Sequence, residues 1–555
     1  MRRFDVLTIL TVTSLTSSMQ HSSQPVEPIS LAVVNARIWT GDSRRPWADA
    51  MAISRERITT VGSSAEVRKL VTPATRVIDA HGMMVVPGFI DSHVHFLDGG
   101  FGLSSVQLRD AKTPQEFVRR IAEYAKTLPA GAWITNGDWD HEQWGGDLPR
   151  RDWIDSVTAN NPVWVSRLDG HMSLANGAAL RAAGITKATQ EVAGGTIVRD
   201  AHGEPTGILK DNAMSLVGRV QPDPSREEQD RALDAAMRYV AGNGVTSVTH
   251  MGSWSDLAVF ERAQAAGRLK TRIYAAVPLA TWERLRDTVK ARGRGDEWLK
   301  IGALKGFVDG SLGSHTAAML APFTDAPNDT GLFVSTREQL YAWTSGADKA
   351  GLHVIVHAIG DRAIRTQLDI YDRVEREDGA RDRRFRIEHA QHIAPTDIPR
   401  FAALGVIASM QPYHAIDDGR WAEKVIGHER GKGTYAFRSL LDKHTRLAFG
   451  SDWAVAPATP LEGIYAAVTR RTLDGAHLGG WYPEQKITVE DALRAYTSGG
   501  AYASYDERDK GTIERGKLAD FVMIDRDITR IAPDEIARAR VVMTVVGGRI
   551  VHSHE

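Results

Sequence analysis

The sequence predicts a (β/α)8 TIM barrel, an α/β fold, with a composite β-sandwich domain and a large insertion after the first barrel strand. Two observations lead to this prediction. Eight short apolar segments in the middle of the chain alternate with helical patterns, and eight is the strand number of such a barrel. Short segments in which apolar and polar residues alternate occur at both ends of the chain, which favours one small β-domain built from the two termini.

The first thirty residues differ in composition from the rest of the chain. Arg2 and Arg3 precede an apolar stretch at 6–12, and a Ser/Thr-rich tail runs to Pro25. A basic start, an apolar centre and a small polar tail are typical of a secretory signal. We expect residues 1–30 to be a signal peptide and the protein to be periplasmic or extracellular. The alternatives are a disordered tail and a cytoplasmic location.

The β-domain is expected to comprise residues 31–85 and 505–555. Strand patterns with Gly and Asp turns lie at 31–39, 52–53 and 58–62. A matching pattern returns at 519–525 and 541–551.

Residues 86–500 are predicted to form the barrel. The eight strands are expected at 89–96, 245–250, 272–277, 301–308, 353–357, 385–389, 406–410 and 446–452. Ser225 and Glu228 form a capping-box pattern before one helix, and Ser335 with Glu338 announces another.

The first two barrel strands are separated by residues 97–243, whereas a βα loop usually has about 2–6 residues. We expect this insertion to form a lid or subdomain that faces the substrate.

Composition excludes several function classes. The 555-residue chain has a formal net charge of −1, so nothing in its charge favours nucleic acid. No segment after the N-terminus approaches the ~18 apolar residues of a membrane span. A glycine-rich dinucleotide fingerprint between a strand and a helix is absent, which argues against a redox enzyme. We expect a small-molecule substrate, and a homo-oligomer is compatible with the sequence.

Potential metal ligands gather at strand ends. His93 and His95 are two apart in a strand and therefore project to the same face, although a lone His-x-His is weak evidence. Barrel active sites collect side chains from the C-terminal ends of different strands. Ligand-capable residues end five of the eight strands: His93 with His95, Lys305, His357, His389 and Asp452. One such histidine is more often a core residue, but five strand ends together predict a metal centre.

The chain contains no cysteine, so the metal must be bound by imidazole, carboxylate or a modified lysine. These ligands suit Zn²⁺, and also Mn²⁺ or Fe²⁺. We expect one or two divalent ions, with zinc as the first choice of metal. Burial would lower the pKa of Lys305, and the neutral amine could take up carbon dioxide to give N6-carboxylysine, a bridging carboxylate. The alternative is an ion-paired or snorkelling lysine.

Together these motifs resemble the amidohydrolase superfamily, in particular the branch related to N-substituted formamide deformylases. The resemblance extends over residues 31–551 and is carried by 87–95 (Pro-Gly-Phe-Ile-Asp-Ser-His-Val-His), 305–310, 357–361, 387–389, 410–412, 450–452 and 516–520. It implies a metal-dependent hydrolase. It also implies that His93, His95, His357, His389 and Asp452 are metal ligands, and that Lys305 stands at the position carboxylated in part of the superfamily. His250 departs from the Asp that is frequent near this position.

Candidate substrate contacts follow or flank these motifs. They are Trp139, His171, His250, Tyr413, His414 and Trp453, with Trp144 as a further aromatic. Ordinary core packing is the competing interpretation for each of them.

We therefore expect hydrolysis of a non-peptide C–N bond, in an N-substituted amide, formamide or cyclic amide. Asp452 would be the general base, and His171, His250 or His414 would hold the developing oxyanion. The alternatives are a dipeptide or ester hydrolase with the same site, and a catalytically silent binding protein that keeps the pocket.

Overall fold

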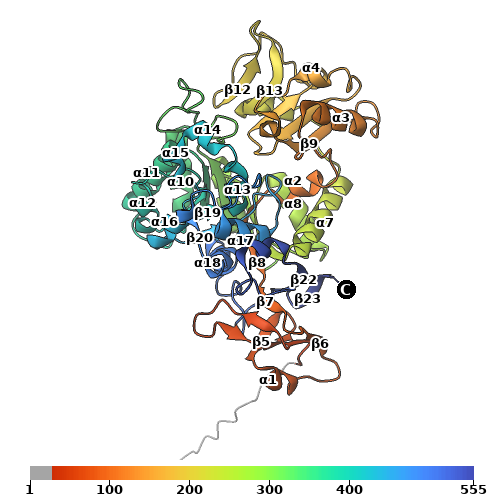
Figure 1. The fold of residues 1–555 in the computed structure, drawn as a ribbon, viewed down its shortest axis with the longest axis vertical. Helices are drawn as coiled ribbons and strands as arrows, with labels where there is room; N and C mark the ends of the chain where they lie inside the picture. The colour runs from red at the N-terminus through yellow and green to blue at the C-terminus, as the bar shows by residue number, and fades with distance from the viewer. Residues whose placement is uncertain (1–27, 555) are drawn as a thin grey trace, which may run out of the picture.

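The computed structural model describes residues 28–554, so the predicted signal peptide lies almost wholly outside the described residues. Three units follow one another along the long axis (Figure 1): the β-domain at one end, the barrel in the middle and the insertion at the other end. Among residues 28–554, no helix is both long and apolar enough to cross a bilayer.

The middle unit confirms the predicted (β/α)8 barrel. Its eight strands lie in one sheet in the order β20-β19-β18-β17-β16-β15-β14-β8, and all neighbours in the sheet are parallel. The strands are β8 (Phe89–Val94), β14 (Val245–Met251), β15 (Arg272–Pro278), β16 (Leu299–Phe307), β17 (His353–Ala358), β18 (Arg386–His389), β19 (Ile407–Met410) and β20 (Leu447–Phe449). The residues after β20 return to β8, where the Asp452 amide donates to the His93 carbonyl at 2.7 Å.

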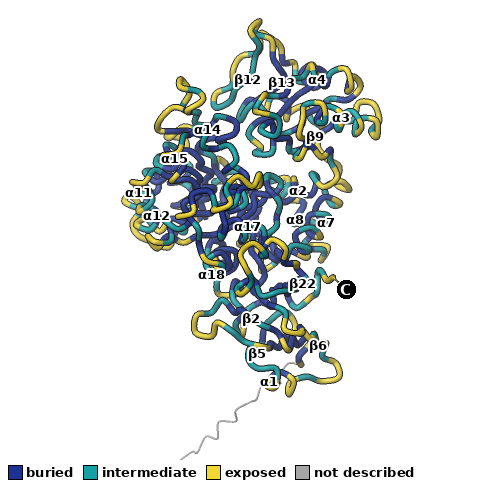
Figure 2. The backbone as a smooth tube through the Cα atoms, viewed as in Figure 1, coloured by how far each residue is buried: buried dark blue, intermediate teal, exposed yellow. Residues whose placement is uncertain are grey.

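Amphipathic helices surround these strands. They include α7 (Arg226–Gly242), α8 (Trp254–Ala265), α9 (Trp282–Arg292), α10 (Arg337–Lys349), α11 (Asp361–Asp378) and α17 (Pro460–Thr469). Ser225 and Glu228 form the predicted capping box of α7. The capping box of α10 is formed by Thr336 and Gln339, one residue later than predicted. The Thr336 hydroxyl, and not that of Ser335, accepts a hydrogen bond from the Gln339 amide. Figure 2 shows that buried residues concentrate in the barrel.

Both chain ends build the β-domain. A four-stranded sheet has the order β5-β4-β1-β6, and a six-stranded sheet has the order β23-β22-β21-β7-β2-β3. The strands are β1 (Leu31–Val34), β2 (Arg37–Trp39), β3 (Trp47–Ala48), β4 (Ala50–Ser54), β5 (Arg57–Gly62), β6 (Arg76–Asp79), β7 (Met84–Pro87), β21 (Phe521–Ile524), β22 (Val541–Val546) and β23 (Arg549–Ser553). Antiparallel pairing of β21 with β7 joins the two ends, and Val33, Met51, Phe521 and Val545 share one apolar core.

The insertion has a sheet and cores of its own. Its strand order is β12-β13-β11-β10-β9, from β9 (Ile134–Trp139), β10 (Val163–Arg167), β11 (Met172–Ala175), β12 (Gly195–Arg199) and β13 (Pro205–Asp211). Helix α3 (Pro114–Ala125) packs on it through Phe117 and Ile121. The flanking helices α2 (Phe96–Gly102) and α7 pack against each other and share the barrel core. The separate unit is therefore the part of the sequence that runs from the end of α2 to the start of α7.

Candidate metal centre

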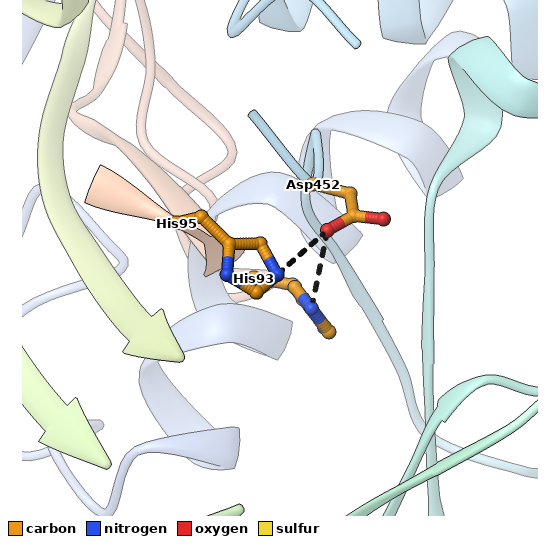
Figure 3. A group of neighbouring side chains, drawn as sticks. All are labelled: His93, His95 and Asp452. Atoms are coloured by element: carbon orange, nitrogen blue, oxygen red, sulfur yellow. Dashed lines mark ion pairs between the residues drawn. The ribbon is translucent and has the colours of Figure 1, made fainter. Parts of the chain in front are cut away.

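Four side chains converge on one point at the C-terminal end of the barrel. The Nε2 atoms of His93 and His95 lie 3.3 and 3.4 Å from Oδ1 of Asp452, and Figure 3 shows both rings directed at this oxygen. Nζ of Lys305 lies 3.3 Å from Nε2 of His93. The ends of β8 and β16 and the turn after β20 therefore bring together four of the six side chains that the sequence predicts for the metal centre.

This donor set fits a divalent cation. Two ligands that bind one ion tetrahedrally at about 2.0–2.1 Å are themselves about 3.3 Å apart, which matches the observed separations. Oδ1 of Asp452 is buried and has no hydrogen-bond partner among residues 28–554. Burial lowers the pKa values of His93, His357 and His389, so their imidazoles are neutral, as metal binding requires.

A buried ion pair fixes the orientation of His93. Its Nδ1 donates to Oε2 of Glu388 at 2.6 Å, and Oε1 of Glu388 accepts from Nε of Arg386 at 2.7 Å. Arg386 also donates to the Ser92 carbonyl at 2.6 Å and to Oγ of Ser409 at 2.9 Å. Proton placement on Nδ1 leaves the lone pair of Nε2 free for the metal. Sequence reasoning missed the pair of Arg386 and Glu388, although these two residues are two apart in a strand and their side chains therefore lie on the same face.

Asp91 connects the two segments that carry the cluster. Its Oδ1 accepts from the Ser451 amide at 2.8 Å and from the His93 amide at 3.2 Å, and its Oδ2 accepts from Oγ of Ser451 at 2.5 Å. Burial raises the pKa of Asp91 to about 7. These bonds hold the turn after β20, in which Asp452 adopts a φ of 63° and presents its carboxylate to the cavity.

A second group lies beside the first. His389, His414 and Asp452 each offer a ligand atom within 4.8 Å of the others. His357 lies close by, with its ring 4.6 Å from that of His389, but its Nε2 donates to the Gly310 carbonyl at 3.0 Å. His357 is in neither of the two groups found in the described chain, so its role as a ligand stays a prediction.

Apart from the fully buried His93, the members of both groups line a cavity of about 320 Å³ between the barrel and the insertion. Of the predicted site residues, those that line it are His95, His171, Lys305, His357, His389, His414 and Asp452. His171 comes from the insertion, and its Nδ1 donates to Oδ1 of Asp211 at 2.7 Å. Although burial alone would lower it, the Asp211 carboxylate raises the pKa of His171.

An ion pair within the insertion contacts the barrel at the cavity wall. Arg167 on β10 lies 2.6 Å from Oδ2 of Asp169, and both side chains line the cavity. The same oxygen accepts from the hydroxyl groups of Ser311 and Ser314, which follow β16. Sequence reasoning did not single out Arg167, because nothing local marks it as different from a surface arginine.

Four of the predicted substrate contacts, Trp139, His250, Tyr413 and Trp453, do not line this cavity. Trp139 is fully buried in the core of the insertion, where its Nε1 donates to the Val165 carbonyl. Nδ1 of His250 accepts from the Phe96 amide at 3.0 Å, and its Nε2 contacts Asp256 at 3.2 Å, so both nitrogens are occupied.

The remaining two lie outside the cavity lining. Trp453 stacks on Tyr239 at 4.7 Å, and Tyr413 is not a lining residue. Trp144 packs against the core of the insertion and donates to the Asp147 carbonyl. Core packing, the competing interpretation for aromatic residues, holds for Trp139, Trp144 and Trp453.

Comparison with known proteins agrees with this geometry. A model of the amidohydrolase family matches residues 76–552. Protein LONG AFTER FAR-RED 3 of Arabidopsis thaliana is 42% identical over 94% of this chain and 91% of its own length. N-substituted formamide deformylase of Arthrobacter pascens is 31% identical over 93% of this chain and 97% of its own length. A solved metal-dependent hydrolase of Pyrococcus horikoshii superposes with a TM-score of 0.74 at 28% identity, covering 91% of this chain and 99% of that one.

Proposed function

This chain belongs to the amidohydrolase family, and from that premise we propose that it hydrolyses a non-peptide C–N bond of a small molecule by a metal-dependent mechanism. The substrate is an N-substituted amide, a formamide or a cyclic amide. The observation that carries the proposal is the convergence of His93, His95 and Asp452 on one point of the cavity. The similarity to an N-substituted formamide deformylase supports the choice of bond.

His93, His95 and Asp452 would hold the metal, for which zinc is the first choice because imidazole and carboxylate are its usual ligands. A bound divalent ion lowers the pKa of a water molecule and polarises a substrate carbonyl. Glu388 keeps His93 in the tautomer that can bind, and Asp91 holds the turn that carries Asp452.

Asp452 is the proposed general base. Its Oδ1 faces the two imidazoles, whereas its Oδ2 lies 3.9 Å from Nδ1 of His389. One oxygen can therefore bind metal while the other accepts a proton from water and returns it to the leaving nitrogen. His171 and His414 line the same cavity and are the candidates for contact with the developing oxyanion. His250 is no longer a candidate, because both of its nitrogens are occupied.

Lys305 is the proposed site of carboxylation. The side chain is buried, and burial lowers its pKa to about 8, so an appreciable share of the amine is neutral near pH 7. The neutral nitrogen attacks carbon dioxide, an N–C bond forms and one proton leaves, which gives a carbamate. A carbamate would place carboxylate-like oxygens beside His93, whose Nε2 is 3.3 Å from the amine.

The decisive experiment combines metal analysis with a substrate panel. The purified protein should contain one to two equivalents of metal and should lose turnover with a chelator. It should cleave N-substituted formamides, other amides or cyclic amides faster than dipeptides or esters of matched size. Less than about 0.2 metal per chain, with turnover unaffected by added metal, would contradict the proposal.

We further propose that the chain is exported and cleaved within roughly its first 30 residues, on the sequence pattern alone. N-terminal sequencing of protein recovered from its source organism tests this. Intact Met1 on cytosolic protein would rule it out.

A further inference from the structure

We propose that Asp98 and Asp138 form a subsite for a cationic amino group of the substrate. The substrate is then an amide that carries a positive charge close to the scissile C–N bond. This inference rests on the proposed function, because it names the substrate class of the same cavity.

Two carboxylates of the cavity lining have no partner. Asp98 lies in the first turn of α2, three residues after the proposed ligand His95, and Asp138 lies in β9 of the insertion. Both residues line the cavity, and the hydrogen bonds and ion pairs found within residues 28–554 include neither carboxylate. The barrel side and the insertion therefore each contribute one unpaired negative charge.

The charge of Asp138 is unfavourable without a bound cation. Burial raises the pKa of Asp138 to about 6, and the nearby charge of Asp98 acts in the same direction. Arg109 opposes this shift in pKa, but its guanidinium is 3.5 Å from Asp417 and donates to the Val455 carbonyl. Because an opposite charge favours the ionised form of a carboxyl group, a substrate ammonium beside Asp98 and Asp138 would stabilise both carboxylates.

Both arginines that line the cavity are paired with other aspartates. Arg167 lies 2.6 Å from Asp169, and Arg420 donates to the Asp417 carboxylate. Asp140 lies 3.5 and 3.4 Å from the two guanidinium groups. A substrate carboxylate would have to displace one of these aspartates, which disfavours a dipeptide with a free carboxylate. The fixed charges of the lining thus favour a cationic substrate over an anionic one.

An unpaired nitrogen in the same cavity supports a bound ligand there. His414 lines the cavity and is only 9% exposed, and its Nε2 is buried with no hydrogen-bond partner in the described part of the chain. Buried polar atoms are nearly always paired, so this nitrogen calls for a polar group of a bound molecule. The cavity of about 320 Å³ has the size of a small-molecule site.

The test compares three probes of one length that differ in charge at the end away from the formyl group. N-(3-aminopropyl)formamide is cationic, N-butylformamide is its neutral counterpart, and N-formyl-β-alanine is anionic. Metal-loaded full-length protein is assayed with each probe at pH 8, where the ammonium group is charged. The readout is the ratio of kcat/KM values or, if no probe is cleaved, the ratio of the dissociation constants from calorimetry. We expect the wild type to prefer the cationic probe over the neutral one by at least about 10-fold, the lower end for a hydrogen bond to a charged group.

Two isosteric variants assign the preference to the subsite. Asp98→Asn and Asp138→Asn keep the shape of the side chains and remove their charges. Each should lower the preference for the cationic probe, and the double variant should abolish it. Asp152→Asn is the control, because Asp152 is an exposed carboxylate of the insertion outside the cavity lining, and it should keep the wild-type ratio. Metal content of each preparation shows whether the centre is intact, and if the double variant does not fold, the two single variants decide.

Equal values for the cationic and neutral probes in the wild type would overturn the inference. So would a preference for the anionic probe, or a preference for the cation that persists in the variants. Failure to cleave these probes and every other amide of the panel would instead count against the proposed function. The dissociation constants would still decide the inference, so the two failures are distinguishable.

Discussion

At the residue scale, metal binding and proton transfer can be separated at Asp452. Asp452→Asn keeps the size of the side chain and one coordinating oxygen but removes the basic group. General-base assistance is typically worth about 10²–10⁴-fold in rate, so turnover should fall by at least about 10²-fold while most of the metal remains. Steady-state kinetics and metal analysis of the same preparation check this expectation.

His93→Ala provides the contrast to that substitution. His93 is fully buried, and its Nε2 faces Asp452, so its loss should remove metal and activity together. Near-normal turnover of metal-loaded Asp452→Asn would mean that another group is the base. His171 and His414 would then be the groups to examine, since both line the cavity.

Lys305 leads to a prediction about pH. Only the neutral amine forms a carbamate, and the neutral fraction rises as pH climbs through the lowered pKa of about 8. After chelator treatment at low bicarbonate, recovery of activity with zinc should therefore require carbon dioxide. At a constant concentration of dissolved carbon dioxide, the rate of this recovery should increase from pH 7 to pH 8.5.

The control for this pH experiment is Lys305→Met, which should show no response to carbon dioxide. Recovery of the wild type at the same rate without carbon dioxide at every pH would exclude a carbamate.

At the element scale, much of the barrel could be predicted because its strands are short apolar segments that end in polar residues. The candidate ligands at the ends of β8, β17 and β18 lie where that pattern places them. Side chains whose partners are distant in sequence could not be placed. Trp139 looks like a pocket wall until the core of the insertion is seen, and His250 looks free until Phe96 and Asp256 are placed beside it.

The insertion should respond as a unit when its buried ion pair is broken. Arg167→Met leaves the carboxylate of Asp169 without its buried cation, and such a loss costs about 3–5 kcal/mol. Hydrogen exchange should accelerate in residues 134–211, whereas the barrel strands β16 to β18 should be unaffected. Arg119→Met is the control, because Arg119 forms an exposed pair with Glu123 on α3 that is worth about 0.5 kcal/mol. Equal exchange in the two variants would show that Arg167 does not hold the insertion.

At the scale of the whole molecule, the β-domain and the barrel are joined by a buried ion pair. Arg272, the first residue of β15, donates to both oxygens of Asp520, at 2.7 and 3.0 Å, and Oδ1 of Asp520 also accepts from the Gly547 amide. The two side chains are only 1% and 4% exposed. A contact of this kind couples the stability of the two units, because neither unit can move away without leaving a buried charge unpaired.

Asp520→Ala should therefore destabilise both units together by about 3–5 kcal/mol, the usual cost of removing one partner of a buried pair. Hydrogen exchange followed peptide by peptide should rise in β21 and β22 and, to a similar extent, in β14 and β15. Arg549→Ala is the control from the same β-domain, since Arg549 and Glu56 form an exposed pair 2.9 Å apart whose loss costs at most about 1 kcal/mol. Faster exchange confined to residues 28–85 and 519–554 would mean that the β-domain unfolds independently. In that case the six-stranded sheet, and not the contact with the barrel, would be what holds the two chain ends together.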